Sequence, residues 1–575
     1  STIYQSPQPL SPSSISTLEK SHLTQRSDNS TQLSQRLDPT EDGFLQPLPD
    51  PDAERPIEGE PVLPSQEQTP PDAVPVPDDP AGRLFVNRIE VVGSTVFEPM
   101  QLEAITQPLE GREVALTELI QAADAIAQLY FSAGYINSTA IVGEQEVEDG
   151  VVQISVTEGR LQDIQVEGLQ RLKPGYIRSR MRHADNVPLN ANQIEEQLRL
   201  LRADANIADV RAQLNPGDRP GESILVVQVT EEKAWSAGVG IDNYSPPSVG
   251  SERMQASLGY RNLSGLGDTL GVTYYRTTIG GSNIWDATYQ VPVNAMDGTV
   301  SLRAVLNNNQ VTQSGAIPFS VDGNSERYEV SFRQPLVRRL QDEFALSFGY
   351  SYRDGETLVG LGDAGIASTE RSTNVFKFGQ DYTHRDTTGT WALRSQFNLG
   401  FASQDITDPG DNSAASEDST FLSWLGQAQR VQVLGRDHLL IAQGDLQLSV
   451  DDLPPSEQYV LGGGQSLRGY RQNARIGDNA LRFSVEDRIT ITREDDNTPV
   501  WQLAPFVDLG LVWNSGNSQL STEQNFLAGI GIGSLLTPAE GLTLRLDYAL
   551  PLIDLDDRGR NAQDDGFYFN VNYRY

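Results

Sequence analysis

The 575-residue chain contains no cysteine and no long hydrophobic run. The lack of cysteine excludes disulfides, thiolate metal sites and cysteine nucleophiles. Transmembrane helices are excluded as well, because no stretch of about 18 apolar residues occurs. The mean hydropathy of −0.40 still allows a membrane β-barrel, since each strand of such a barrel is apolar on one face only.

Positive charge is also scarce. The 43 basic residues face 78 acidic ones, which gives a net charge of −35. A nucleic-acid partner is therefore not expected, because phosphate binding needs a basic surface. An acidic cluster at Asp405, Asp408 and Asp411 leaves divalent-cation binding open, although solvated loops have the same composition.

Signatures of metal, cofactor and catalytic sites are missing. The run from Gly464 to Arg468 fails the nucleophile-elbow pattern at its last position, and the glycine-rich run 360–365 lacks the lysine of a phosphate loop. The histidines are too scattered to act as a ligand set. We therefore predict no enzymatic activity, no catalytic residue, no metal and no cofactor. The four histidines are His22, His183, His384 and His438.

Residues 1–82 differ in composition from the rest of the chain. They hold a large share of the 33 prolines, and residues 47–80 are both Pro-rich and acidic, so we predict a disordered segment and a linker. A loose helical pattern between Ile15 and Leu37 leaves a short helix, docked inside a barrel, as the alternative. Since no signal sequence opens the chain, we interpret it as a mature chain whose signal peptide has been removed.

Two segments, 83–159 and 160–232, repeat one order of elements, βααββ. Helices are predicted from apolar residues at a spacing of three or four, and strands from alternation between turn signals. The predicted strands are 84–92, 137–142, 151–158, 161–166, 207–214 and 223–231. The predicted helices are 98–106, 116–133, 174–181 and 192–201. Two unrelated α+β domains remain the alternative.

From residue 233 to 575 the helical pattern is replaced by strict alternation. The last strand shows this most clearly, because an apolar residue occurs at every second position. About sixteen such strands fit the segment, which is typical of an antiparallel transmembrane barrel, although a soluble sandwich alternates in the same way. The apolar positions of the last strand are Phe567, Phe569, Val571, Tyr573 and Tyr575.

Two short motifs stand out within the predicted barrel. A glycine triplet leads into Leu467-Arg468-Gly469-Tyr470, and a strand about forty residues later carries Phe506-Val507-Asp508-Leu509-Gly510. We predict that the loop 452–476 folds into the lumen and that Arg468 pairs there with Asp508, because a guanidinium offers a planar fork to a carboxylate. An exposed loop arginine and an unrelated strand aspartate are the alternative.

Together, these features resemble the superfamily of outer-membrane barrels that carry POTRA modules. Two modules and a Pro-rich N-terminal extension are similar to the two-partner secretion transporters (TpsB, the ShlB/FhaC/HecB haemolysin secretion/activation family). The segments 240–250 and 262–268 also resemble the opening hairpin of these barrels. One departure is the N-terminal block, which is longer and more acidic than such transporters need.

The resemblance implies translocation of an unfolded exoprotein with an N-terminal secretion domain across a Gram-negative-type outer membrane. Residues 1–232 would then be periplasmic, and the barrel would contact lipid and lipopolysaccharide. The resemblance also implies a C-terminal signal for the barrel-assembly machinery at Phe569, Val571, Tyr573 and Tyr575. A barrel-assembly insertase of the same superfamily and a small-solute porin are the alternatives.

A group of arginines in the second module is the candidate client-binding surface. It could receive an acidic, unfolded client, although a solvated helix face has the same composition. These residues are Arg178, Arg180, Arg182, Arg199 and Arg202.

Overall fold

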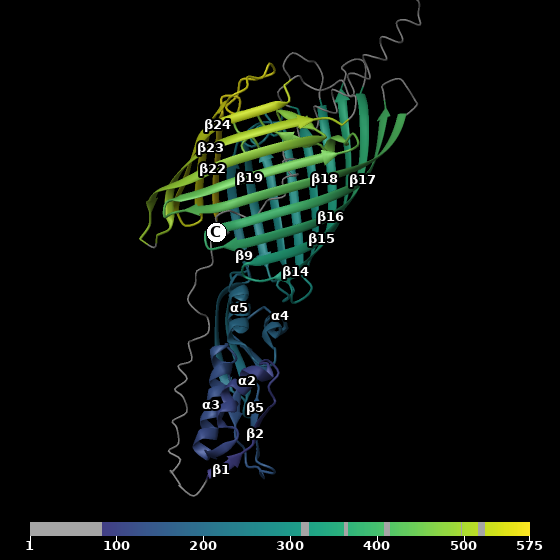
Figure 1. Cartoon of the computed structure of the whole chain (residues 1–575). Coiled ribbons are helices and arrows are strands. Elements are labelled where there is room, and N and C mark those ends of the chain that lie inside the picture. Colours follow the sequence, from purple (N-terminus) through teal and green to yellow (C-terminus); the bar gives the residue numbers. More distant parts are fainter. Residues whose placement is uncertain (1–82, 312–320, 361–365, 408–414, 496, 516–523) are drawn as a thin grey trace, which may run out of the picture.

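The computed structural model describes residues 83–311, 321–360, 366–407, 415–495, 497–515 and 524–575. Figure 1 shows an elongated α/β region that leads into one end of a large barrel. The disorder, linker and docking helix predicted for residues 1–82 lie outside the described residues. None of the helices in the described ranges has the length and hydropathy that a membrane span requires.

The first part of the α/β region contains two small sheets and two helices. Its main sheet has the order β2-β5-β4, with β2 parallel to β5, and β1 pairs separately with β3. The predicted strand 84–92 is in fact two strands, because the chain turns at Asn87, whose N–H donates to the carbonyl of Gly150. The elements are β1 (Arg83–Val86), β2 (Arg88–Val92), α2 (Pro99–Thr106), β3 (Arg112–Ala115), α3 (Leu116–Ser132), β4 (Thr139–Ile141) and β5 (Val151–Thr157).

The amphipathic pattern of α3 explains how this part is held together. Leu119, Ala123, Ile126 and Tyr130 recur every three or four residues and are buried against the sheet. The side chain of Glu118 accepts the N–H of Ala115 at the start of the helix, which satisfies one of the backbone donors exposed there. The buried face of α3 therefore forms a hydrophobic core for this part, separate from the core of the part that follows it in the chain.

The second part has the order βααββ around its own core, which the first part shares apart from its additional strands β1 and β3. Its sheet runs β6-β8-β7, with β6 parallel to β8, and α4 and α5 pack on one face. Ile194, Leu198 and Leu201 give α5 its buried stripe, and Asn190 caps it by accepting the N–H of Asn192. The elements are β6 (Arg160–Glu167), α4 (Pro174–Met181), α5 (Ala191–Arg202), β7 (Ile207–Pro216) and β8 (Glu222–Glu231).

Sixteen antiparallel strands then close into a barrel, in which β26 pairs with β9. The number of strands agrees with the sequence prediction. The strands are β9 (Trp235–Asp242), β10 (Arg253–Arg261), β11 (Thr269–Thr277), β12 (Ser282–Pro292), β13 (Thr299–Gln310), β14 (Val321–Arg338), β15 (Asp342–Gly360), β16 (Ile366–Asp386), β17 (Gly389–Thr407), β18 (Ala415–Leu434), β19 (His438–Ser449), β22 (Asn479–Arg493), β23 (Pro499–Trp513), β24 (Phe526–Ala539), β25 (Leu542–Pro551) and β26 (Phe567–Arg574).

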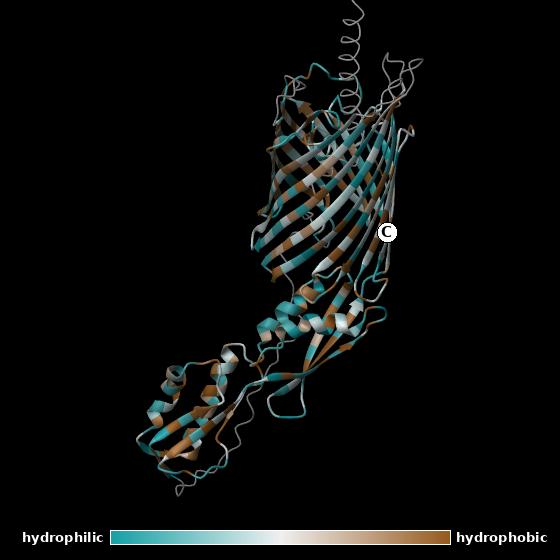
Figure 2. Ribbon diagram, turned by 90° about the vertical axis from the view of Figure 1, so that its right-hand side faces the viewer, coloured by the Kyte–Doolittle hydropathy of each residue, from teal (hydrophilic) through white to brown (hydrophobic). Residues whose placement is uncertain are grey.

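The alternation of the barrel strands places apolar side chains on the outside. On β17, Phe397, Leu399 and Phe401 are 43–46% exposed, whereas Asn398 between them is only 3% exposed and faces inward. Hydrophobic and hydrophilic positions alternate along the barrel strands in Figure 2. An apolar exterior around a polar interior suits a barrel in lipid, and it rules out the sandwich alternative, whose apolar faces would be buried.

The α/β region docks tightly on the barrel through the turn between β10 and β11. The N–H of Lys173 donates to the carbonyl of Gly265 at 3.0 Å, and Asn206 donates to the carbonyl of Gly267 at 3.2 Å. A Cβ on Gly267 would stand 2.5 Å from the ring of Tyr176, so this position requires glycine, which also suits its φ of +80°. The glycines that the sequence marks in 262–268 thus create room for helix α4.

A second contact ties α4 to the next turn of the barrel. The guanidinium of Arg180 lies 3.5 Å from the centre of the Tyr176 ring and donates to Asp297 at 2.6 Å. Asp297 also accepts a hydrogen bond from Arg338 of β14 at 3.1 Å. Helix α4 and β14 are therefore joined through a single carboxylate.

A buried carboxylate also orders the chain segment just before α4. Glu231 accepts hydrogen bonds from the N–H groups of Gln170, Arg171 and Leu172, each at 2.8 Å. Burial acts to raise the pKa of Glu231, but these backbone donors outweigh it, so the pKa lies below its usual value. The segment that leads into α4 is thus held by an ionised group.

Candidate functional site

The chain between β19 and β22 folds into the barrel and carries the short hairpin β20 (Tyr459–Leu461) and β21 (Arg475–Gly477). Tyr459, Leu461 and Leu467 are almost fully buried in a cluster with side chains of the wall. The loop predicted at 452–476 thus packs against the barrel interior. The wall residues of that cluster are Leu425, Ala480, Val512 and Leu527.

Arg468 and Asp508 form the contact expected from the sequence. Nε and Nη2 of Arg468 donate to the two carboxylate oxygens of Asp508 at 2.7 and 2.9 Å, and the Arg468 N–H donates to the same group at 3.0 Å. The residues are 6% and 1% exposed. Since both charges are buried, each needs the other as its partner. Removal of one of them would lower the free energy of unfolding by about 3–5 kcal/mol.

The pair belongs to a larger network of alternating charges. Nη1 of Arg468 donates to Glu486 at 2.7 Å, and Glu486 also accepts from Arg488 at 2.9 Å and Arg545 at 2.7 Å. Arg545 in turn donates to Asp547 at 2.7 Å. Three arginines therefore balance three carboxylates, so that the loop is seated without leaving an excess of either charge.

The motif on β23 shapes the seat around this network. Phe506 places its ring 3.2 Å from the guanidinium carbon of Arg468, a cation–π arrangement. A Cβ on Gly510 would stand 2.7 Å from Leu467 and 2.8 Å from Leu461, so glycine leaves room for the loop. The alternate residues of the motif thus have three roles: Phe506 stacks on Arg468, Asp508 pairs with its charge, and Gly510 leaves space for the leucines of the loop.

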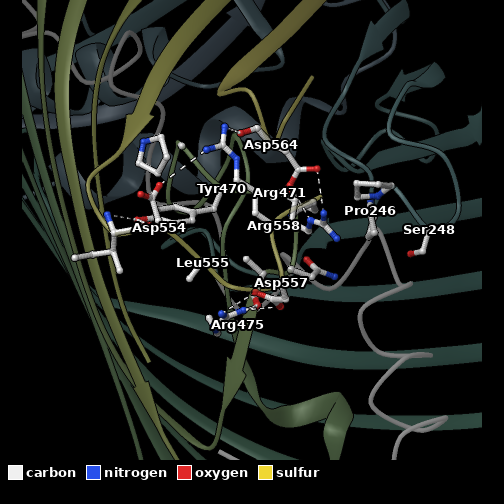
Figure 3. Close-up of a pocket in the computed structure, with 17 residues that line it drawn as sticks. Pro246, Ser248, Tyr470, Arg471, Arg475, Asp554, Leu555, Asp557, Arg558 and Asp564 are labelled. Atoms are coloured by element: carbon white, nitrogen blue, oxygen red, sulfur yellow. Dashed lines mark hydrogen bonds and ion pairs between the residues drawn. The ribbon is translucent and has the colours of Figure 1, made fainter. Parts of the chain in front are cut away.

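A second anchor holds the loop toward the end of the barrel that lies away from the α/β region. Arg471 binds both oxygens of Asp564 at 2.9 and 3.0 Å, and Arg475 binds both oxygens of Asp557 at 3.0 and 3.1 Å. Both arginines line a cavity of about 120 Å³. Figure 3 shows them turned toward these carboxylates. The segment between β25 and β26 thus binds the loop at the end of the barrel that lies away from the α/β region.

Several residues of the site were not predicted from the sequence. Glu486 follows Arg482 and Ser484 at every second position of β22, and Arg545 and Asp547 alternate in the same way on β25. Charges that alternate along a predicted barrel strand face the lumen. The pattern therefore predicts that these side chains point inward, but it does not predict which residue each of them contacts. The missed members are Glu486, Arg488, Arg545, Asp547 and Tyr568.

The predicted client-binding group of arginines is not a single surface. Arg180 is 4% exposed and paired with the barrel, so its candidate role as a client-binding residue is wrong. Arg178 donates to the carbonyl of Ile164, and Arg199 pairs with Glu195 at 2.8 Å. The side chains of this group therefore serve several local contacts, while Arg182 is exposed.

The remaining candidate residues are spread over the barrel. The predicted C-terminal signal lies on β26 and just beyond it, where Tyr573 and Tyr575 are 47% and 75% exposed. Asp405 belongs to β17, whereas Asp408 and Asp411 lie outside the described residues. In the described ranges, no group of three or more His, Asp or Glu side chains is arranged to hold a metal.

Comparison with known families identifies the architecture. The model of the haemolysin secretion/activation protein ShlB/FhaC/HecB matches residues 221–536. The chain belongs to this family. A model of the ShlB-type POTRA domain matches residues 84–159, which contain β2, β5 and both helices of the first part.

Relatives of this transporter cover most of its length. It is 27% identical over 429 residues to the outer membrane transporter CdiB of Escherichia coli O6:K15:H31 (strain 536 / UPEC), which is 70% of this chain and 69% of that protein. It is 24% identical over 488 residues to the heme/hemopexin transporter protein HuxB of Haemophilus influenzae, 82% of this chain and 83% of HuxB. The protein is thus an outer-membrane transporter of the two-partner secretion type, with its POTRA-like region in the periplasm.

A solved structure shows the same fold. CdiB from Escherichia coli superposes with a TM-score of 0.65 at 21% identity, and the match covers 99% of this chain and 100% of CdiB. The structure of CdiB from Acinetobacter baumannii gives a TM-score of 0.58 at 16% identity, with 97% and 98% coverage. Since the POTRA-like region is periplasmic, the end of the barrel at β10–β11, where this region docks, is the periplasmic end.

Proposed function

We propose that this transporter moves an unfolded exoprotein through its barrel and that the Arg468 network keeps the lumenal loop in place between transport events. The main support is that arginines and carboxylates are buried in equal number where the loop contacts the wall. A sixteen-strand barrel encloses an aqueous channel unless something fills it. The lumenal loop can fill this channel reversibly, because the ion pairs that hold it break and re-form without covalent chemistry.

The charged network suits a loop that must leave its seat. Bidentate pairs such as Arg468–Asp508 hold the loop in one geometry, in addition to the apolar packing of Leu461 and Leu467. When the loop moves, water and the client replace these partners. The resting barrel would then be narrow, and the transporting barrel would be wide.

We further propose that residues 83–159 and 160–232 are two POTRA domains that receive the client, and that residues 233–575 form the pore. The family match to 84–159 and the matching three-stranded sheets, β2-β5-β4 and β6-β8-β7, support this division. Among the described residues, each outer strand of these sheets pairs with one neighbour only, so an extended polypeptide would add there by β-augmentation. The client would present an N-terminal secretion domain to them.

The remaining partner assignments follow from the location. The barrel would contact lipid and lipopolysaccharide, and the barrel-assembly machinery would insert it. We propose a channel that has no catalytic step and no nucleic-acid partner, with client folding outside the cell as the driving force. Family membership favours secretion over the alternatives of an assembly insertase and a porin.

A secretion assay tests the function. The transporter is co-expressed with the secreted protein encoded beside it, and the surface-exposed client is measured for wild type, Asp508→Ala and Asp286→Ala. Asp286 forms a bidentate pair with Arg303 in the barrel and has no hydrogen-bond partner among the described residues of the loop, so its variant is the matched control. We expect impaired secretion for Asp508→Ala only. Normal secretion by that variant would remove the role of the network.

A further inference from the structure

Five consecutive strands of the barrel are much longer than a membrane requires. β14 to β18 contain 18, 19, 21, 19 and 20 residues, whereas β9 and β26 contain 8 each. About 9–11 residues span the hydrocarbon layer. The outward apolar positions of β17 end at Phe401 and are followed by Ser403 and Asp405, so the last part of this strand stands above the membrane. The long strands reach the upper right of Figure 1.

This raised wall has one open edge. β18 pairs with β17 from Ala415 onward, but its pairing with β19 begins only at Ser423, opposite Ser449. Among the residues that the structure describes, no strand pairs with the second side of Ser416–Leu422. We call Ser416–Leu422 the open edge.

The direction of the backbone groups along this edge follows from Leu422 at its base. Leu422 donates its N–H to Asp451 at 3.2 Å, and its carbonyl accepts from Ser449 at 3.3 Å. Both groups therefore point away from β17. Backbone direction alternates along a strand, so the N–H and C=O groups of Ser416, Asp418 and Thr420 point to the same open side.

The open edge begins at the point where the lumenal loop leaves the wall. Phe421, 1% exposed, packs with Leu453 of the loop and with Val375 of β16. Gly400 leaves room for this ring, since a Cβ there would stand 1.9 Å from it. The open edge therefore lies beside the place where the loop leaves the wall, within reach of a polypeptide that leaves the lumen there.

We infer that the open edge binds the emerging polypeptide as an additional antiparallel strand on the cell-surface side. The inference rests on the proposed function, which supplies an extended chain at this exit. Free edges pair with other chains through the backbone, and this makes the binding tolerant of sequence. Glu417 and Asp418 point to opposite faces of the strand and favour a segment with basic or neutral side chains over an acidic one.

The lack of cysteine allows a direct test. Val450 is 76% exposed and follows Ser449, so a strand attached at position 450 would continue the path of β19 along the open edge. A peptide of eight alternating Thr and Lys residues with an N-terminal cysteine is disulfide-linked to the Val450→Cys variant, which places it at a millimolar effective concentration. Hydrogen exchange of 415–422 is then measured in lipid nanodiscs.

We expect exchange at Asp418 and Thr420 to slow by about tenfold, as one hydrogen bond per amide predicts. A peptide N-methylated on the residues that face β18 should give no protection. Asp418→Pro, which removes a donor on the open side, should abolish protection of Thr420, whereas Asp418→Ala should retain it. Unchanged exchange, or equal protection by the N-methylated peptide, would overturn the inference. Because this test does not involve secretion, its failure leaves the transport function standing.

Discussion

The hydroxyl of Tyr568 on the last strand of the barrel donates to the carbonyl oxygen of Tyr470 on the lumenal loop at 2.6 Å. The same hydroxyl accepts the N–H of Gly469 at 2.9 Å. Tyr568 is fully buried, so both backbone groups depend on it for a partner. Strand β26, which closes the barrel by pairing with β9, therefore holds the loop at Gly469 and Tyr470, next to the Arg468 network.

The Tyr568→Phe variant should loosen the loop without disturbing the barrel. Two buried backbone groups lose their partner, at a cost of about 1–3 kcal/mol each. We expect more frequent opening events in single-channel recordings. Tyr573→Phe is the control, because Tyr573 lies on the same strand with its side chain 47% exposed. Equal behaviour of the two variants would show that the hydroxyl of Tyr568 does not hold the loop.

Gly510→Ala should displace the loop by steric conflict. The added methyl would stand 2.7 Å from Leu467, and such overpacking costs about 1–3 kcal/mol. Trypsin should then cleave after Arg468, which is buried in the wild-type protein. Gly271→Ala on β11 is the matched control, because nothing lies within 4 Å of its added methyl. Resistance to cleavage in both variants would contradict the close packing at Gly510.

Asp297→Asn should loosen the joint between the POTRA-like region and the barrel. Arg180 is 4% exposed and would lose its charged partner, at a cost of about 1–3 kcal/mol. Spin labels on cysteines at Ala203 and Thr387 should report a broader distance distribution. Asp209→Asn, which breaks an exposed pair with Arg211, should leave the distribution unchanged. A narrow distribution in Asp297→Asn would mean that the glycine turn alone fixes the joint.

Acid should weaken the POTRA-like region through Glu231. Its pKa in the folded protein lies below the unfolded value of 4.5, so its stabilising contribution is complete above about pH 4.5 and is lost as the pH falls through the folded pKa. Urea unfolding followed by circular dichroism at 222 nm reports this region, because all described α-helices lie there. Glu231→Gln should unfold with a smaller dependence on pH in that range. An unchanged pH dependence would assign the effect to other carboxylates.

The sequence predicted the number of barrel strands because each of them carries its own period-two pattern. Helices α3 and α4 were likewise predicted to within a residue, since apolar spacing and Pro174 mark them locally. The short strand β3 was missed because four residues are too few to show a period. Local patterns therefore sufficed wherever one element buries one face.

The site was predictable only in part. Arg468 and Asp508 could be paired because an arginine on a glycine-rich loop and a strand aspartate needed partners. Glu486 could not be assigned, because its contact with Arg468 depends on the register of three neighbouring strands. Arg180 was misread for a related reason: a basic residue on a helix gives no sign that a turn more than a hundred residues away covers it.

Single-channel conductance shows whether Arg468 and Asp508 hold the loop in the lumen. Wild type, Asp508→Ala, a deletion of 460–475 and the control Asp286→Ala are compared in planar bilayers. We expect a small, flickering conductance for wild type and control, larger openings for Asp508→Ala and the largest conductance for the deletion. A large, steady conductance that is the same in all four proteins would contradict this expectation.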